Sequence, residues 1–172
     1  KIILDIDPNE LAKQTIRPDL PIHCDVRPFL ETMNTKLNAG PLLQRKDWIW
    51  WCKERKDRYP VVLPEYRKVK KQVNPYVFCD VLSDYLGERD IIVSSNGSSC
   101  VIPIQSLRLE KGQRHIVNSG CAAMGYGLPS AIGACFADKN RRVICLDGDG
   151  SIQLNIQELQ TIVHHQLPVK IF

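Results

Sequence analysis

A chain of 172 residues has room for about one domain, or for one domain and a piece of another, and a hydrophobic share of 44% is ordinary for a globular protein. The net charge of +4 is modest, and the basic stretch over residues 53–71 contains no recognisable binding motif, so we expect no nucleic-acid partner. The sequence has no apolar run of membrane-spanning length and no secretory signal, so we expect no membrane contact.

The first part of the chain is predicted to alternate strands with helices. Residues 2–6 and 20–24 are short apolar runs typical of strands. After the first run, Asp7 is placed to cap a helix and Glu10 to complete a capping box. After the second run, Asp25 is placed to cap a longer helix. The apolar residues of that helix recur on one face: Phe29, Leu30, Met33 and Leu37.

Residues 39–72 have the composition of a connector. Gly40 and Pro41 are expected to end the preceding helix. Residues 46–58 form a second helical pattern that contains the tryptophans of the chain, and residues 60–72 form a basic, proline-broken loop. We expect the tryptophans to pack this helix against a domain, because large aromatic side chains mostly contribute buried area.

From residue 73 onward, strands and helices alternate regularly. Strands are predicted over residues 91–93, 115–117, 142–146 and 169–172. Helices are predicted over residues 75–86, 128–137 and 152–166. Asn74 caps the first, which turns Val77, Val81, Leu82 and Tyr85 inward. In the last, Asn155 and Glu158 have the spacing of a capping box, so its regular part is expected to begin near Asn155. The pattern predicts an α/β fold, a doubly wound parallel sheet with helices on both faces. The chain begins and ends inside predicted strands, so we expect it to be part of a longer polypeptide.

Three turns with small or polar residues follow predicted strands, at residues 96–98, 120–124 and 148–151. Ligands of open parallel sheets bind outside the carboxyl ends of the strands, so we expect these turns to meet at one edge. In the last turn, two glycines flank Asp149 where a strand gives way to a helix. Glycine permits a close approach of the backbone, a helix start suits a phosphate, and a carboxylate suits Mg²⁺. This turn therefore predicts a site for a metal-bound diphosphate.

Two segments carry a resemblance to a known family. Residues 120–134 read GCAAMGYGLPSAIGA, and residues 147–159 read DGDGSIQLNIQEL. Both closely resemble the diphosphate-binding domain of thiamine diphosphate enzymes, with acetolactate synthases as the nearest branch. The resemblance implies three parts: residues 1–38 as the tail of a central α/β domain, residues 39–72 as an interdomain connector, and residues 73–172 as a thiamine diphosphate-binding domain truncated at its C-terminal side.

The resemblance also implies roles for individual residues. Asp149 would be the ligand through which Mg²⁺ joins the protein to the diphosphate. Met124 would be the bulky residue beneath the cofactor that holds its two rings in a V, which makes it the chain's candidate catalytic residue. Ala122 and Met124 would contact the aminopyrimidine ring through backbone groups. The remaining cofactor contacts would come from Asn96, Gly97, Ser98, Gly148, Gly150 and Ser151.

The function implied is that of a thiamine diphosphate- and Mg²⁺-dependent decarboxylase or carboligase, acting on a small 2-oxo acid and assembled as a homodimer or tetramer. The activating glutamate and a second metal ligand of the family lie outside this chain, so we expect the segment alone to be inactive. The turn at residues 96–99 lacks the Gly-Gln-His of typical acetolactate synthases, which leaves the reaction open. Asp5 and Asp25 match positions that hold FAD in some relatives, although strand-end acids and helix caps explain them equally well.

Simpler explanations exist for several of these features. Asp149 alone could be an ordinary turn residue, and Met124 alone could fill a core. The fold could also survive as a non-catalytic binding or assembly module. The histidines are expected to pack or to complement helix ends rather than to react: His23, His115, His164 and His165. The seven cysteines are odd in number and contain no C-x-x-C pair, which argues against disulfides or zinc and favours a reducing cytoplasm.

Overall fold

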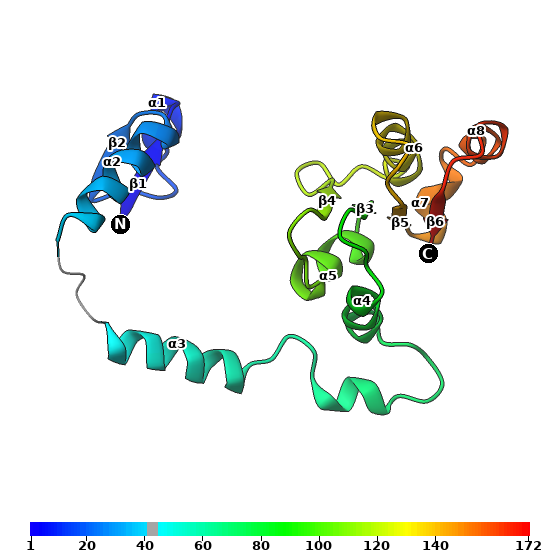
Figure 1. Cartoon of the computed structure of the whole chain (residues 1–172), viewed down its shortest axis with the longest axis horizontal. Coiled ribbons are helices and arrows are strands. Elements are labelled where there is room, and N and C mark those ends of the chain that lie inside the picture. Colours follow the sequence, from blue (N-terminus) through cyan, green and yellow to red (C-terminus); the bar gives the residue numbers. More distant parts are fainter. Residues whose placement is uncertain (41–44) are drawn as a thin grey trace. The chain divides into compact units, whose positions relative to one another are not determined.

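The protein is described by a computed structural model over residues 1–40 and 45–172 (Figure 1). It divides into two compact units, Lys1–Arg55 and Lys56–Phe172. This boundary falls inside the predicted connector, and the three-part division at residues 38 and 72 stays a prediction. Pro41, expected to help end a helix, lies outside the described residues. None of the helices in the described ranges has the length and apolar character needed to cross a membrane.

The first unit contains a pair of parallel strands with a helix after each. β1 (Ile2–Asp5) pairs with β2 (Leu20–His23). Asp7 caps α1 (Pro8–Leu11) by accepting a hydrogen bond from the Asn9 N–H at 2.8 Å. The side chain of Glu10 pairs with Lys13 at 2.5 Å instead of closing a capping box, so that part of the prediction was wrong. A lysine one turn later competes successfully for the carboxylate.

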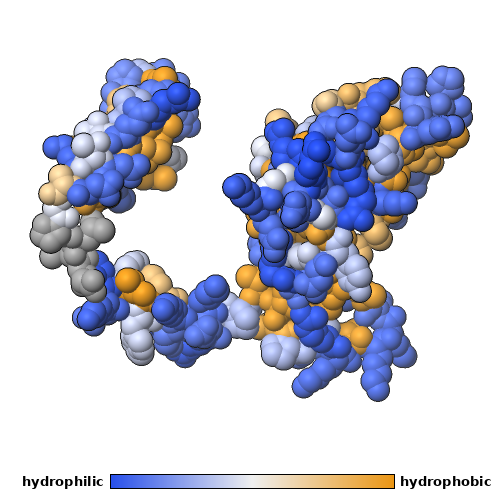
Figure 2. All heavy atoms as spheres, in the orientation of Figure 1, coloured by the Kyte–Doolittle hydropathy of each residue, from blue (hydrophilic) through white to orange (hydrophobic). Residues whose placement is uncertain are grey.

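The predicted helix after the second strand is confirmed as α2 (Val26–Asn38), with the Asp25 carboxylate accepting from the Arg27 N–H at 2.7 Å. Its apolar face is not covered by other described residues. Leu30, Met33 and Leu37 keep 50%, 45% and 46% of their surface exposed. Figure 2 shows hydrophobic surface of this kind on the first unit. The periodicity of the sequence thus indicated the helix correctly but could not indicate what packs on it.

The second helical pattern is confirmed as α3 (Lys46–Arg58). The rings of Trp48 and Trp51 stack with their centroids 5.0 Å apart, and the Arg55 guanidinium lies 4.9 Å from the centre of the Trp51 ring. All the tryptophans remain well exposed, Trp50 at 67%. Two of the tryptophan rings pack on each other, and the expected packing of this helix against a domain stays a prediction.

The second unit is built on a four-stranded parallel sheet in the order β4–β3–β5–β6. The strands are β3 (Ile91–Ser94), β4 (Arg114–Val117), β5 (Val143–Leu146) and β6 (Val169–Ile171). The other elements are the short 3₁₀ helix η1 (Pro64–Lys68) and the helices α4 (Pro75–Asp84), α5 (Ser98–Ser106), α6 (Gly127–Ala137), α7 (Asp149–Gln153) and α8 (Glu158–His164). The central strands β3 and β5 are wholly buried, which explains why they read as continuous apolar runs.

Apolar side chains cover both faces of this sheet. One face packs with residues of α6 and α8 in a cluster that includes Ile91, Val93, Leu128, Ile132, Val143, Cys145 and Ile162. The other packs with α4 and its surroundings in a cluster that includes Ile92, Ile144, Leu146, Phe78, Leu82 and Leu86. Each fully buried aliphatic side chain stabilises the fold by roughly 1.5–3 kcal/mol. The predicted α/β class, with a parallel sheet and helices on both faces, is confirmed.

The inward face predicted for α4 was partly wrong. Leu82 packs against the sheet as predicted, but Val81 and Tyr85 are exposed at 40% and 73%. Phe78 and, just beyond the end of the helix, Leu86 pack against the sheet with Leu82. Both sets recur every four residues, so periodicity alone could not choose between them.

Two helical predictions at the sheet edge also needed correction. The turn predicted at residues 96–99 leads directly into α5, a helix that the sequence analysis did not predict. The single helix predicted over residues 152–166 is broken into α7 and α8. Between them the backbone makes tight i to i−3 hydrogen bonds, such as Glu158 N–H to Asn155 O at 2.9 Å. The N-cap of α8 is Gln157, so the predicted capping box is not formed.

Candidate functional site

Two of the predicted turns lie side by side because the central strands are neighbours. Ser94 at the end of β3 pairs with Leu146 at the end of β5. The chain then runs from β3 through Asn96 and Gly97 into α5, and from β5 through Gly148 into α7. Both turns therefore emerge at the carboxyl edge of the sheet, the position at which open α/β sheets bind ligands.

A cavity of about 260 Å³ lies at this edge. Its lining residues are Asn96, Gly97, Ser98, Ser99, Met124, Gly148, Asp149, Gly150 and Ser151. The structure thus brings together every predicted cofactor-binding residue except Ala122, which does not line the cavity. Ser99 is an addition that sequence reasoning missed, although the run of serines after Gly97 was visible. Its hydroxyl donates to the Asn96 carbonyl at 2.7 Å and closes the turn.

The glycines leave the cavity open to a backbone-bound ligand. Gly97 has φ of +55° and ψ of −135°, a conformation that side chains with a Cβ rarely adopt. A Cβ built on Gly97 or Gly148 would meet nothing within 4 Å, so both glycines border open space. The N–H groups of Asp149 and the two residues after it occupy the first turn of α7 and have no intrahelical acceptor by position. An anion can therefore approach these donors closely.

Asp149 is exposed in the first turn of α7, where its carboxylate faces solvent at the cavity. Among the residues that the structure describes, no group of three His, Cys, Asp or Glu side chains is arranged to hold a metal ion. A divalent cation at Asp149 would therefore need oxygen ligands from a bound phosphate or from elsewhere. Because α7 has only five residues, its dipole is weaker than that of the long helix expected from the sequence.

Met124 lies across the cavity from this turn. Its side chain is 51% exposed, which is inconsistent with a simple role in filling the core. A Cβ built on Gly150 would lie 3.6 Å from the Met124 methyl carbon, so the side chain extends over the start of α7. Ala122, two residues earlier, has φ of +50°, an unusual conformation for a residue other than glycine. The Asn118 side chain supports this loop by donating to the Ala123 carbonyl at 3.0 Å.

Ser151 is buried beneath the cavity, with only 2% of its surface exposed. Its hydroxyl accepts a hydrogen bond from the Gly125 N–H at 2.9 Å and lies 3.0 Å from the hydroxyl of Ser95. Both interactions keep the hydroxyl inside the fold. A contact from Ser151 to a phosphate would therefore come from its backbone N–H.

Asp147 is a carboxylate that sequence reasoning quoted but assigned no role. Oδ1 accepts from the Gly148 N–H at 2.9 Å and shapes the turn. Oδ2 is buried and has no hydrogen-bond partner among the described residues. A Cβ on Gly127 would lie 2.6 Å from this oxygen, so a glycine at that position is needed for α6 to start against the carboxylate. Burial, with a smaller contribution from the charge of Asp147, raises the pKa of the Cys145 thiol to about 12, which keeps that thiol protonated and unreactive.

His115 on β4 lies beside the end of β3, with Nε2 2.8 Å from the Ser94 hydroxyl. Burial lowers the pKa of this imidazole below its usual value of 6.5. The folded state therefore favours the neutral form of His115. Just below pH 6.5, this imidazole binds more protons in the unfolded chain than in the folded one. The contribution of His115 to stability is present above that pH and is lost as the pH falls toward the lower folded-state pKa.

We expect the substitution His115→Gln to flatten the pH dependence of the free energy of unfolding in the range just below 6.5, since Gln does not titrate. Urea denaturation at several pH values from roughly 5 to 7 would measure this dependence. His164→Gln is the control, because His164 is exposed at the end of α8 and gives up little water on folding. A slope in the His115→Gln variant equal to that of the unsubstituted protein would contradict the assignment.

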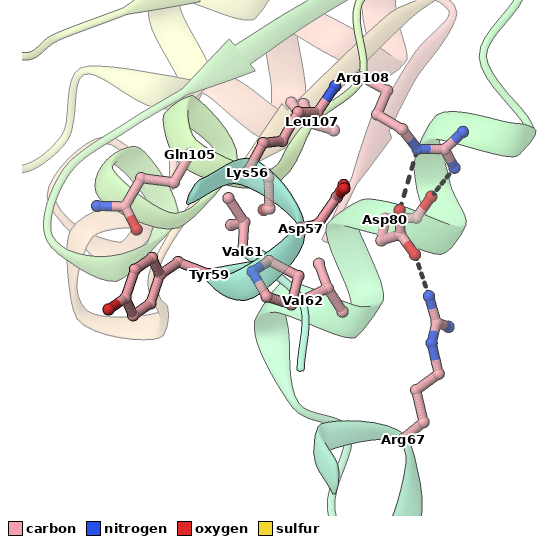
Figure 3. A pocket seen from close by; sticks show the side chains of 12 residues that line it. Lys56, Asp57, Tyr59, Val61, Val62, Arg67, Asp80, Gln105, Leu107 and Arg108 are labelled. Carbon is pink, nitrogen blue, oxygen red and sulfur yellow. Dashed lines mark hydrogen bonds and ion pairs between the residues drawn. The ribbon is translucent and has the colours of Figure 1, made fainter. Parts of the chain in front are cut away.

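A second cavity, of about 570 Å³, lies between the connector and helices α4 and α5 (Figure 3). Arg67 and Arg108 both bind Asp80, the latter at 3.0 Å, and Arg108 also reaches Asp84 at 2.6 Å. Because these cations are already paired with carboxylates, the cavity is poorly suited to a phosphate. It contains none of the predicted site residues, and its ion pairs serve to attach the connector to α4.

A third cavity, of about 260 Å³, lies in the first unit at the ends of β1 and β2. Asp5 and Asp25, the aspartates matched to FAD-binding positions, both line it. Each carboxylate already accepts a backbone hydrogen bond, from Asp7 N–H at 2.8 Å and from Arg27 N–H at 2.7 Å respectively. The structure thus gives both aspartates a local structural role and leaves the FAD assignment a prediction.

Comparison with known proteins agrees with this geometry. Residues 95–172 match the family described as "Thiamine pyrophosphate enzyme, C-terminal TPP binding domain". The chain is 33% identical over 99% of its length to "Acetolactate synthase large subunit" of Cyanidium caldarium and covers 29% of that protein. It is 33% identical over 96% of its length to "Acetolactate synthase isozyme 3 large subunit" of Escherichia coli (strain K12), again covering 29%. It is 32% identical over 98% of its length to "Acetolactate synthase 2, chloroplastic" of Brassica napus and covers 26% of that protein.

The chain thus spans less than a third of the length of the curated relatives that it matches. The matched segment, residues 95–172, contains most strands of the parallel sheet and the turns at its carboxyl edge. Residues 95–172 thus match the C-terminal cofactor-binding domain of thiamine pyrophosphate enzymes, and the chain is similar to acetolactate synthases along nearly all of its length.

Proposed function

We propose that this chain is the cofactor-binding part of a thiamine diphosphate- and Mg²⁺-dependent enzyme of the acetolactate synthase type. Such an enzyme decarboxylates a small 2-oxo acid and joins the remaining fragment to an acceptor. The observation that supports this most strongly is the cavity at the carboxyl edge of the sheet, because its lining contains every predicted cofactor-binding residue except Ala122. The names of the relatives suggest the acetolactate synthase reaction.

The residues around this cavity fit a metal-bound diphosphate. Gly97 and Gly148 border open space, and a Cβ at either position would project into it. The first N–H groups of α7 can donate to phosphate oxygens, and Asp149 can ligate Mg²⁺ beside them. The cation is needed because one carboxylate and a diphosphate carry only negative charge. We therefore assign the diphosphate to this turn and the metal to Asp149.

The other end of the cofactor is assigned to the Met124 loop. When bound, thiamine diphosphate supplies a thiazolium ring that holds the electrons released as the 2-oxo acid loses CO₂. The half-exposed Met124 side chain offers an apolar support for the cofactor, and Ala122 places its backbone in the same loop. The roles of these residues are to orient the cofactor and to exclude water from one side of it.

The remainder of the active site is assigned to residues outside this chain. The Asp147 N–H donates to the Phe172 carbonyl at 3.0 Å, so residues that follow Phe172 in a longer polypeptide would begin beside the diphosphate turn. A second metal ligand can reach the site from there. We further propose an activating glutamate from another domain, assembly as a homodimer or tetramer, a cytoplasmic location, and no carboligase activity for the segment alone. FAD at the Asp5 and Asp25 cavity is a weaker part of the proposal.

Calorimetric titration of the full-length protein with thiamine diphosphate tests this function. We expect saturable binding in the presence of Mg²⁺, strong weakening by EDTA, and little binding of thiamine, which has no phosphates. The pattern follows because the metal and the diphosphate hold each other in the site. Absence of binding with Mg²⁺ present, or equal binding of thiamine and its diphosphate, would refute the proposal.

A further inference from the structure

Asn155 lies in the tight turn between α7 and α8, outside the cavity and without a role in the proposed site. Its sequence position suggested a helix cap, but its side chain reaches a different part of the fold. The Nδ2 amide donates to the Gly125 carbonyl at 2.7 Å, across 30 positions of sequence. A residue with the local spacing of a helix cap thus makes a long-range contact that sequence periodicity could not indicate.

Gly125 is held on both sides of its backbone by this region. Its N–H donates to the Ser151 hydroxyl at 2.9 Å, while its carbonyl accepts from Asn155. The residue is buried with φ of +81°. A Cβ there would lie 2.8 Å from Asn155 Nδ2 and 3.0 Å from Leu154 Cβ, so no side chain fits. The backbone at Gly125 has little freedom to move while both contacts persist.

The hydrogen bonds around Gly125 also connect to Ser95, the residue directly after β3. The Ser151 hydroxyl that accepts from Gly125 also lies 3.0 Å from the hydroxyl of Ser95, and both serines are almost completely buried. One buried hydroxyl therefore connects the residue before the Asn96 turn, the first turn of α7 and the loop that carries Met124. Buried polar groups joined in this way specify one arrangement of the segments around them.

Met124 is the residue immediately before Gly125, so the Gly125 N–H belongs to the peptide group that joins the two. Because Ser151 holds that N–H and Asn155 holds the next carbonyl, the direction of the Met124 side chain depends on both contacts. Met124 itself is half exposed and lies over Gly150, where few neighbours would otherwise restrain it. Loss of the Asn155 contact would leave a buried carbonyl without its partner and free the loop.

We propose that Asn155 is a positioning residue for the cofactor, which acts through Gly125 to hold Met124 at the correct place against α7. Ser151 belongs to the same network, and its hydroxyl positions the loop instead of binding phosphate. The inference rests on the proposed function, in which Met124 supports the thiamine rings. A displacement of this support by a fraction of an ångström matters because reactive groups must be held in a productive geometry.

The substitution Asn155→Asp tests the inference, because it keeps the shape of the side chain and replaces the amide donor with an oxygen that repels the Gly125 carbonyl. Gln160→Glu is a matched control that makes the same chemical change on an exposed residue of α8. Asn155→Ala removes the donor without repulsion and replaces the Asp variant if that variant fails to fold. The first readout is a spectrum of methyl-labelled methionine in this chain, which contains two methionines, Met33 and Met124.

We expect Asn155→Asp to shift and sharpen the Met124 methyl signal through increased motion, with Met33 and the Gln160→Glu variant unchanged. The second readout uses the full-length protein saturated with thiamine diphosphate and Mg²⁺. There, hydrogen–deuterium exchange at C2 of the bound thiazolium should slow by about tenfold or more, while the dissociation constant changes by less than about threefold. A purely structural residue would lower the melting temperature without this split between exchange rate and affinity.

An unchanged Met124 methyl signal would overturn the inference, as would weaker cofactor binding with an unchanged exchange rate. Failure of the unsubstituted full-length protein to bind the cofactor would instead refute the proposed function. In that case the methyl spectrum alone decides whether Asn155 positions Met124, because it requires no cofactor.

Discussion

Substitution of Asp149 with Ala is expected to abolish Mg²⁺-dependent binding of thiamine diphosphate. Asp149 is the exposed carboxylate of the cavity, and no second cluster of metal-binding side chains exists among the described residues to replace it. Loss of a residue that merely orients a metal ligand costs about 10–100-fold in affinity, so loss of the ligand itself should cost at least that much. Calorimetric titration of the full-length variant with cofactor and Mg²⁺ measures the effect.

Asp47→Ala is a suitable control for Asp149→Ala. Asp47 is also an exposed acidic residue in the first turn of a helix, but it lies on α3 and does not line the cavity. The Asp47→Ala variant should bind the cofactor with the affinity of the unsubstituted protein. The two variants together separate loss of a metal ligand from the general effect of removing a negative charge. An Asp149→Ala variant with the affinity of the Asp47→Ala variant would show that the metal is held elsewhere.

The second large effect is expected on stability, from Gly127→Ala. An added Cβ would lie 2.6 Å from Asp147 Oδ2 and 2.9 Å from Ser95 Cβ. Neither neighbour can move aside easily, because Ser95 is fully buried and the Asp147 oxygen is enclosed. Overpacking of this kind costs typically about 1–3 kcal/mol, and here it should also displace the diphosphate turn. Urea denaturation measures the change in the free energy of unfolding.

Gly133→Ala provides the matched control on the same helix. Gly133 lies in the interior of α6 with open space where a Cβ would be, so the substitution should stabilise the protein by roughly 0.5–1 kcal/mol through helix propensity. The same chemical change is thus predicted to have opposite signs at two positions six residues apart. A stability loss of equal size at both positions would mean that contact with Asp147 and Ser95 is not the cause.

Sequence reasoning named most of the residues that line the candidate cavity, because the signals that predict them are local. The strands before the site are buried apolar runs, and the turns after them contain glycines, which suit a backbone-bound anion, and the carboxylate of Asp149, which suits a metal ion. The rule that ligands bind at the carboxyl ends of parallel strands then placed these turns together without any knowledge of distances. Family resemblance added Met124, which no periodicity could have distinguished from a core residue.

The features that were missed depend on contacts between distant parts of the chain. Asn155 and Glu158 have the spacing of a capping box, yet the Asn155 amide bonds to Gly125 and the helix breaks around it. The Ser151 hydroxyl is taken up by Ser95 and Gly125, so its predicted phosphate contact is left to the backbone. Short sequence patterns cannot show which of two available partners a polar side chain selects.

The exposed apolar face of α2 has a related cause. The spacing of Leu30, Met33 and Leu37 correctly predicted one face of a helix, but the partner that a face requires need not lie nearby in sequence. The same limit applied to α4, where two sets of apolar residues had helical spacing and packing against the sheet selected one of them. Local pattern therefore predicted the elements, and packing between elements decided their orientation.

The most direct test of the central claim is a crystal structure of the full-length protein with thiamine diphosphate and Mn²⁺ in place of Mg²⁺. Anomalous scattering locates the metal independently of the surrounding density. We predict a peak in contact with the Asp149 carboxylate and with both phosphates, and a diphosphate that lies along Gly97, Gly148 and the first turn of α7. A metal peak remote from Asp149, or a diphosphate bound outside this cavity, would contradict the account.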